Sequence, residues 1–325
     1  MRVSLAFSGF GPLAGTVEAA QTAEDVGLDG IWTAEHLGFH DAIVPSAMYL
    51  QATKQIEIGM VGFSAASRHP GTLAMELASL CEVGGADRIR IQVGVGDPSL
   101  VGKLGGTTDQ PILRTRQLVD GLREALSGKE INRALLPGTF KNFKLNAYSG
   151  PPPPIDVMAI RPGMQRLAAQ VADGVSLSVA ASRTYLRETV ARVEEELDAA
   201  GRDRSTFRIT ALAFGLIAPG IDAILAGMGP MIATFPPEPM EVLGVGALDG
   251  AAYVEAHQAG RTLDAARMLT ADVMRELTLA AEPDGVGEAL QSFADTGIDE
   301  LGVMPMGPPE LLVDTIKLLA ASRPA

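Results

Sequence analysis

The chain of 325 residues is long enough for one large α/β domain or two medium ones. Its 26 basic and 39 acidic residues leave a net charge of −13, which argues against nucleic acid or an anionic membrane as a partner, because both are held by basic surfaces. The single cysteine, Cys81, excludes a disulfide framework, a zinc finger and an iron–sulfur cluster held within one chain.

Short β-rich runs alternate with helical patterns from the N-terminus onward. Gly9, Gly11 and Pro12 follow the first run too closely for the core of a signal peptide, so we expect a cytoplasmic protein. In the first half we expect strands at 3–7, 30–33, 56–61 and 89–95, and helices at 16–26, 46–53, 72–83 and 111–127. The connection at 136–154, rich in Pro, Gly and Asn, is either an irregular excursion or a small hairpin.

The same alternation resumes in the second half. We expect strands at 155–159, 175–179, 208–217 and 300–304, and helices at 163–171, 184–200, 262–280, 285–295 and 310–321. Eight strand–helix units favour a (β/α)8 TIM barrel with insertions over a doubly wound sheet. We therefore expect a single domain over 1–325 with a loop-rich insertion near 218–260.

Polar residues follow several of the predicted strands, where barrels carry their chemistry. Glu35 and His36 come after the second strand, His69 after the third and Asp97 after the fourth. A histidine at a strand end could act in proton transfer or contact a cofactor, or it could simply satisfy backbone groups. The spacing of His36 and His40 fits one helix face, but further ligands are lacking and we expect no metal.

Glycines also gather at the strand ends. Gly9, Gly94 and Gly96 lie there without forming a complete dinucleotide fingerprint, and small residues in such places let a flat ring lie against the backbone. The segment Arg161-Pro162-Gly163-Met164 opens a helix whose first N–H groups could hold an anion, with Arg161 adding a phosphate contact. The alternative is an ordinary helix start with a solvated arginine.

Six strings along the chain resemble those of one protein family. They are Ala23-Glu24 to Glu35-His36, Ile56-Glu57-Ile58-Gly59 to Ser67-Arg68-His69-Pro70, Arg88 to Gly94-Val95-Gly96-Asp97, Ala168 to Asp173-Gly174-Val175, Ala199-Ala200-Gly201-Arg202-Asp203, and Ala294-Asp295 to Glu300-Leu301. Together they resemble the bacterial luciferase-like superfamily, and most closely the branch that uses the deazaflavin coenzyme F420, typified by methylenetetrahydromethanopterin reductase.

The resemblance implies a barrel that holds a flat flavin or deazaflavin across its strand ends. In the deazaflavin branch a bulge with a non-proline cis peptide backs the ring, and this maps near Met60, Val61 and Gly62. Glu35 and His36 match an acid/base pair beside the ring. Asp97 matches a carboxylate that acts as general acid in dehydrogenase relatives.

The resemblance also implies a set of coenzyme contacts and a reaction class. The predicted coenzyme-binding residues are Gly9, Met60, Val61, Gly62, Arg68, Gly94, Gly96, Arg161, Gly163 and Met164. Reductase relatives often carry Gly-Pro-Lys-Met at the fifth helix, so Arg161 here replaces a lysine or phosphate binding is altered. We expect an F420-dependent oxidoreductase, a homodimer, that reduces a C=N or C=C bond of a small molecule. The alternatives are an FMN-dependent monooxygenase and a cofactor-free barrel with a structural role.

Overall fold

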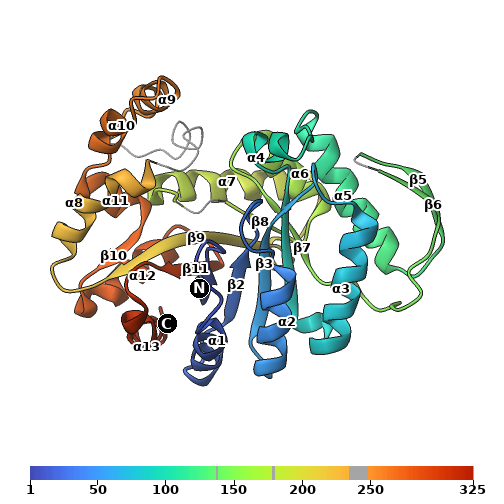
Figure 1. Ribbon diagram of the computed structural model, residues 1–325, viewed down its shortest axis with the longest axis horizontal. Coiled ribbons are helices and arrows are strands. Elements are labelled where there is room, and N and C mark those ends of the chain that lie inside the picture. The colour runs from blue at the N-terminus through green and yellow to red at the C-terminus, as the bar shows by residue number, and fades with distance from the viewer. Residues whose placement is uncertain (137, 178–179, 234–247, 325) are drawn as a thin grey trace.

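Eight parallel strands close into a barrel in the computed structural model, which describes residues 1–136, 138–177, 180–233 and 248–324 (Figure 1). Around the barrel they run in the order β9-β11-β1-β2-β3-β4-β7-β8, and β8 pairs with β9 to complete the circle. The strands are β1 (Arg2–Phe7), β2 (Gly30–Ala34), β3 (Glu57–Ser64), β4 (Ile89–Gly94), β7 (Ile155–Met158), β8 (Gly174–Ser176), β9 (Arg208–Ile217) and β11 (Glu300–Pro305). The predicted (β/α)8 barrel is confirmed.

Helices cover the outside of the barrel (Figure 1). They are α1 (Thr16–Asp25), α2 (Ile43–Ala52), α3 (Pro70–Gly84), α5 (Pro111–Leu126), α6 (Pro162–Val171), α7 (Arg183–Ala199), α12 (Val286–Ala294) and α13 (Leu312–Ala321), with the short α4 (Pro98–Lys103) at the strand ends. Every residue of β2 and β4 is buried. This is expected of parallel strands that face helices on one side and the barrel interior on the other.

A tryptophan fills the middle of the barrel. Trp32 is 1% exposed, and its indole N–H donates to a carboxylate oxygen of Glu300 at 2.8 Å. Gly59 on the neighbouring strand leaves room for it, since a Cβ there would lie 2.3 Å from the indole ring. Residues alternate inward and outward along a strand, so Val61 faces inward like Gly59 while Met60 faces the helices.

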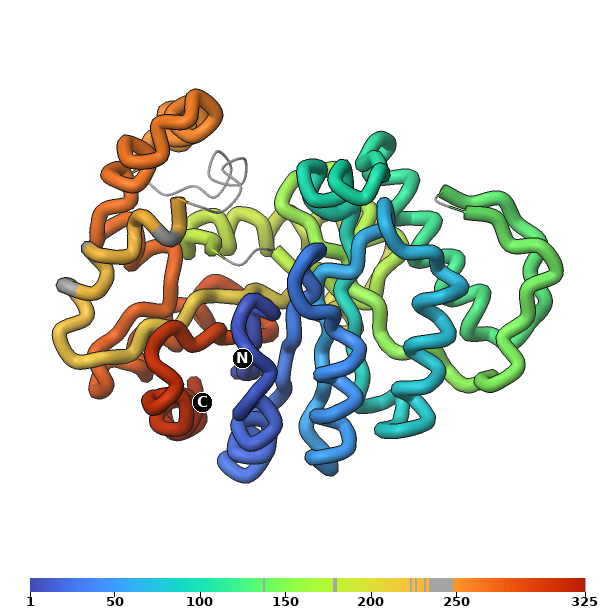
Figure 2. Tube along the Cα trace, viewed as in Figure 1, coloured from blue at the N-terminus to red at the C-terminus, as the bar shows by residue number. Residues whose placement is uncertain are grey.

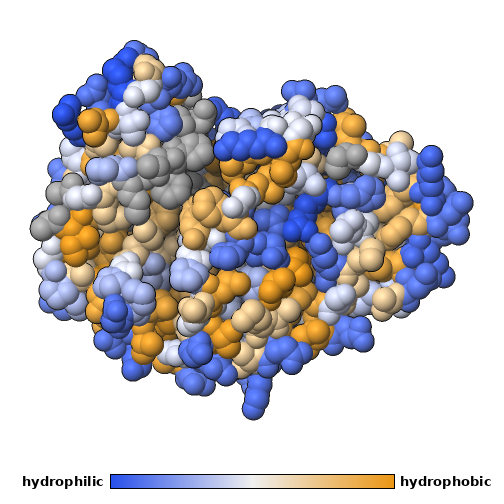
Figure 3. Space-filling model, in the orientation of Figure 1, coloured by the Kyte–Doolittle hydropathy of each residue, from blue (hydrophilic) through white to orange (hydrophobic). Residues whose placement is uncertain are grey.

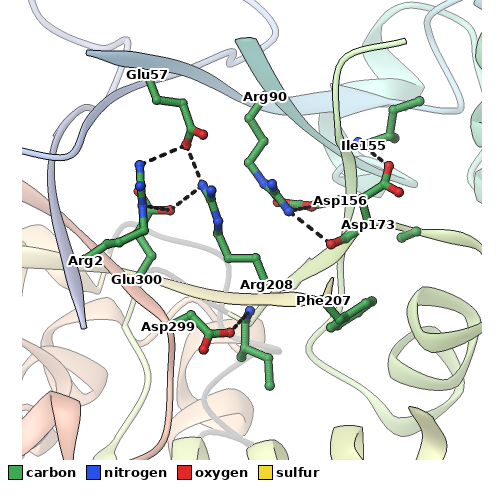
Figure 4. Close-up of polar contacts among 12 residues, drawn as sticks. Arg2, Glu57, Arg90, Ile155, Asp156, Asp173, Phe207, Arg208, Asp299 and Glu300 are labelled. Carbon is green, nitrogen blue, oxygen red and sulfur yellow. Dashed lines mark hydrogen bonds and ion pairs between the residues drawn. The ribbon is translucent and has the colours of Figure 1, made fainter. Parts of the chain in front are cut away.

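Charged residues close the N-terminal end of the barrel (Figure 4). Arg90 holds Asp156 through two hydrogen bonds of 2.7 and 2.6 Å, and both residues are buried. Arg208 is paired with Glu57 and lies 3.0 Å from Glu300. Because each of these charged side chains contacts one of opposite charge, this end of the barrel can bury them. A buried charged side chain without such a partner would destabilise the fold.

The chain leaves the barrel on one side as a hairpin. Strands β5 (Ile131–Ala134) and β6 (Thr139–Phe143) pair in antiparallel fashion and project away from the barrel, as the tube in Figure 2 shows. The hairpin alternative for this connection is therefore correct, although the hairpin begins before residue 136. It packs on the start of α3, where the His69 ring meets Phe140 edge-on at 5.1 Å.

A second excursion lies between β9 and β11, and two predictions for it were wrong. The region near 218–260, expected to be rich in loops, contains α8 (Ile221–Ile232) and α9 (Gly250–Gln258), while 234–247 lie outside the described residues. The helix expected at 262–280 is three elements: α10 (Thr262–Met268), α11 (Ala271–Leu277) and β10 (Leu279–Ala281). Thr270 caps a new helix by accepting from the Val273 N–H, and β10 then pairs with the long end of β9.

The division of the chain into one domain with an insertion stays a prediction. Among the residues described, no helix is both long enough and apolar enough to cross a membrane.

Candidate functional site

A cavity of about 430 Å³ opens at the carboxyl ends of the barrel strands. Eight of the thirteen predicted site residues line it: Glu35, His36, Val61, Gly62, Gly94, Gly96, Asp97 and Met164. The elements β2, β3 and β4 supply its polar side. The elements β7, β8, β9 and β11 supply an opposite side that is almost entirely apolar. Its volume lies in the range of small-molecule and cofactor sites.

The bulge in β3 shapes one wall of this cavity. The ladder between β3 and β4 shifts register between Val61 and Phe63, which leaves Gly62 as the extra residue. Gly62 has φ +105°, and a Cβ there would lie 2.5 Å from the Glu35 carbonyl oxygen. Only glycine fits this backbone without strain, so a smooth surface of main chain faces the cavity at this point.

Glu35 is held by an arginine rather than directed freely into the cavity. Glu35 is only 8% exposed. Both of its carboxylate oxygens accept hydrogen bonds from Arg68, one of them from Nε at 2.9 Å. A second acid, Glu76, lies 2.6 Å from the same guanidinium. Arg68 is therefore ion-paired with two carboxylates. It does not line the main cavity but an adjacent hollow, together with His40 and His69.

His36 is the group in the cavity best suited to exchange a proton. Its ring stacks on Phe10 at 4.1 Å between centroids. Burial lowers the pKa of His36, and a contact with the Ser8 backbone opposes this shift. Among the described residues, no well-formed hydrogen bond satisfies its buried Nδ1. The imidazole is thus kept neutral near pH 7, and its buried Nδ1 lies beside the Gly9 backbone.

Asp97 begins a helix at the rim of the cavity. Its Oδ1 accepts from the Leu100 N–H at 3.0 Å and from the Ser99 hydroxyl at 2.6 Å. This is the usual arrangement of an N-cap, and it accounts for an aspartate at this position without any catalytic role. His69 has a similar position, since its Nδ1 accepts from the Gly71 N–H at the start of α3.

The start of α6 stands beside the cavity, which Met164 and Ile160 line. The N–H groups of Met164 and Gln165 already donate to the Arg161 carbonyl at 3.0 and 3.1 Å. Gly163 is left as the other first-turn donor, and Arg161 is exposed at the helix end. The remaining predicted contacts lie outside the cavity: Gly9 packs against the Ala34 carbonyl, and Met60 is buried toward the helices.

The reasoning from sequence missed the apolar side of the cavity. It consists chiefly of Ile160, Leu177, Leu212, Phe214 and Met304, which come from strand ends that carry no polar motif. Strand periodicity could have placed them, because Leu212 and Phe214 alternate along β9 and the others lie at or just beyond the end of a barrel strand. Within the described residues, no group of three or more His, Cys, Asp or Glu is arranged to hold a metal ion.

Comparison with known proteins agrees with this architecture. The chain is 23% identical over 295 residues to a 5,10-methylenetetrahydromethanopterin reductase from Methanolobus tindarius, covering 89% of this chain and 90% of that protein. A solved coenzyme F420-dependent tetrahydromethanopterin reductase from Methanopyrus kandleri superposes with a TM-score of 0.81 at 19% identity, over 99% and 98% of the two chains. An F420-dependent secondary alcohol dehydrogenase, solved with an F420–acetone adduct, superposes with a TM-score of 0.80 at 20% identity, over 99% of both chains.

The family model described as "Luciferase-like monooxygenase" matches residues 3–300, which is most of the chain and all eight strands of the barrel in whole or part. The protein therefore belongs to the luciferase-like family.

Proposed function

We propose that the strand-end cavity binds coenzyme F420 and that the protein is an F420-dependent oxidoreductase. The observation that carries the proposal is the wall around Gly62, where bare main chain at the β3 bulge and the side chain of His36 line the same cavity. The similarity to F420-dependent enzymes along almost the whole chain supports it. When bound, the deazaflavin supplies or accepts a hydride at a ring carbon.

The residues of the cavity fit a flat ring system. Gly94 and Gly96 line it, and a Cβ at Gly94 would already touch Met158 at 3.3 Å, so a larger side chain would fill the space. Val61 and Gly62 would back the ring through the bulge. The charged tail of the coenzyme would lie outside, near the Gly163 N–H and the Arg161 guanidinium at the start of α6.

In this proposal His36 holds and moves the proton that accompanies the hydride. It is neutral near pH 7 because burial lowers its pKa, so it can receive a proton and return one. Glu35 and Arg68 act as a buried pair that fixes the β2 strand end carrying His36. Asp97 stays a candidate general acid, although its carboxylate already caps the start of α4.

Reduction of a C=N or C=C bond remains the favoured direction, since two curated relatives with which the chain aligns over most of its length are reductases. The second candidate is an FMN-dependent monooxygenase, which the description of the matching family favours. A cofactor-free barrel with a structural role is the third, and a cytoplasmic location stays a prediction.

We also propose a homodimer formed through α2 and α3. Val44 and Met48 on α2, with Met75 and Val83 on α3, are exposed large apolar residues, and apolar atoms lie over α2 on the face seen in Figure 3. α2 carries no charged residue at all. Apart from Gln51, its exposed side chains are apolar, and such a surface is usually buried, which a second copy of the chain would achieve. Light scattering of the wild type and of Met48→Glu tests this, with a monomeric wild type contradicting it.

The test of the coenzyme is an equilibrium titration of the purified protein with oxidised F420 and, separately, with FMN. We expect F420 to bind and His36→Leu to retain binding while losing most hydride transfer, followed as a change in the absorbance of the coenzyme. Tight binding of FMN alone would support the monooxygenase. Binding of neither would support the structural barrel.

A further inference from the structure

The cavity offers no positive charge to a ligand. Among the described residues that line it there is neither a lysine nor an arginine. Positions 137, 178–179, 234–247 and 325, which lie outside the described residues, cannot add one, because their sequence contains no Lys, Arg or His. The only basic side chain that lines the cavity is therefore His36, which burial keeps neutral near pH 7.

The two acidic residues that line the cavity within the described part of the chain, Glu35 and Asp97, do not make it any more favourable for a negatively charged ligand. Glu35 is neutralised by Arg68 behind the wall, and that guanidinium is shared with Glu76. Asp97 holds the start of α4. A substrate carboxylate or phosphate would lose its water here without gaining a cationic partner, and such a buried, unpaired charge is strongly disfavoured.

The side formed by β7, β8, β9 and β11 offers little hydrogen bonding. Leu177, Leu212, Phe214 and Met304 are apolar, and among the described residues only Ser176 on this side carries a polar side chain. On the opposite side the Ser64 hydroxyl already donates to the Val95 carbonyl at 2.7 Å. The side chains left for polar recognition are thus His36 and, at the end of β1, Ser8, whose hydroxyl oxygen accepts from the Phe10 N–H at 3.4 Å.

We infer that the substrate is a largely apolar molecule that carries no negative charge and has one polar reacting group, a C=O, a C=N or an activated C=C bond, which lies at His36. This inference rests on the proposed function and narrows it. In the reducing direction one carbon of the double bond gains the hydride with its two electrons, and the reduced deazaflavin is oxidised. The other atom of the bond would gain one proton, which neutral His36 can only relay from water or from the ring N–H that the deazaflavin gives up on oxidation, so the product would be the saturated compound.

The first test compares matched ligands of one carbon skeleton. Cyclohexanone, its 4-carboxylate and its 4-ammonium derivative are titrated calorimetrically into the coenzyme-free protein, and then used as substrates with reduced F420. We expect the carboxylate to bind at least about 100-fold more weakly than the neutral ketone, the order expected for an unpaired charge in an apolar cavity. We also expect it to bind more weakly than the ammonium compound, because Asp97 lines the cavity and, among the described residues, has no cation beside it. Equal or tighter binding of the carboxylate relative to either of the others, or binding of none of the three, overturns the inference.

The second test places a cation in the cavity. Ile160 lines the apolar side and is only half-buried, so a lysine there can reach water and still face a ligand. Ile160→Lys is expected to improve binding of the carboxylate relative to the neutral ketone at least about tenfold, while Ile160→Met leaves the ratio unchanged. An unchanged ratio in Ile160→Lys contradicts the inference.

These readouts separate the two proposals. If F420 fails to bind while the coenzyme-free protein still prefers the neutral ketone, the coenzyme proposal is wrong and the substrate class stands. If F420 binds and the carboxylate is preferred, the substrate class is wrong and the coenzyme proposal stands.

Discussion

The ion pair between Glu35 and Arg68 gives the sharpest test of how the site is built. Removing the arginine in Arg68→Met leaves a carboxylate that is 8% exposed without its cation, which costs about 3–5 kcal/mol of unfolding free energy. Glu35→Gln costs less, about 1–2 kcal/mol, because Arg68 keeps Glu76 at 2.6 Å and the amide still accepts a hydrogen bond. The double variant should be more stable than the sum of the two losses predicts, by about 1–3 kcal/mol.

Urea unfolding followed by circular dichroism measures all three values, with the midpoint and slope of each transition reported together. The same samples are assayed for F420 binding and for turnover. The structure predicts that folded Glu35→Gln keeps substantial turnover, since the carboxylate is committed to Arg68. The reasoning is refuted if Glu35→Gln unfolds like the wild type and binds the coenzyme yet loses about 1000-fold in turnover, because Glu35 would then act in the chemistry.

Three further results are expected. Gly62→Ala should lose about 1–3 kcal/mol of unfolding free energy and bind F420 at least tenfold more weakly, while Gly38→Ala, with φ +91° but no neighbour within 4 Å, should keep coenzyme affinity. Burial raises the pKa of Asp156 from 3.8 to about 6, so its folded state binds the proton more tightly and the free energy of unfolding should fall as pH rises from 4 to 7; Asp156→Asn should flatten this dependence in urea titrations at each pH. Burial lowers the pKa of His36, so the wild type should lose stability as pH falls below about 6.5, and His36→Leu should lose less in thermal melts.

The barrel could be predicted because its signals are local and repeated. Each parallel strand is a short apolar run between loop signals, and the repetition of eight such units identified the architecture even where boundaries were off by a few residues. The split of 262–280 into two helices and a strand could not be predicted in this way. β10 forms by backbone hydrogen bonding to the far end of β9, residues 215–217. That contact joins segments about 60 residues apart in the sequence.

For the site, sequence indicated which strand ends matter but not which partners each side chain has. Glu35 and His36 are neighbours in sequence, yet Glu35 is bound to Arg68 while His36 lines the cavity. The pairing of Arg90 with Asp156 at the opposite end of the barrel was equally invisible, because it depends on two strands 66 residues apart being adjacent. Long-range pairing of this kind follows from the closed sheet and has no local signature.

The most direct test of the central claim is a titration of F420 against a cavity that has been filled. Gly94 lines the cavity with its Cβ position 3.3 Å from Met158, so Gly94→Leu should occupy the space of the ring. Gly227→Leu, at an exposed helix position with no neighbour within 4 Å, is the matched control. The account predicts that the wild type and the control bind F420 alike and that folded Gly94→Leu binds at least about 100-fold more weakly. Unchanged F420 affinity in Gly94→Leu would contradict it.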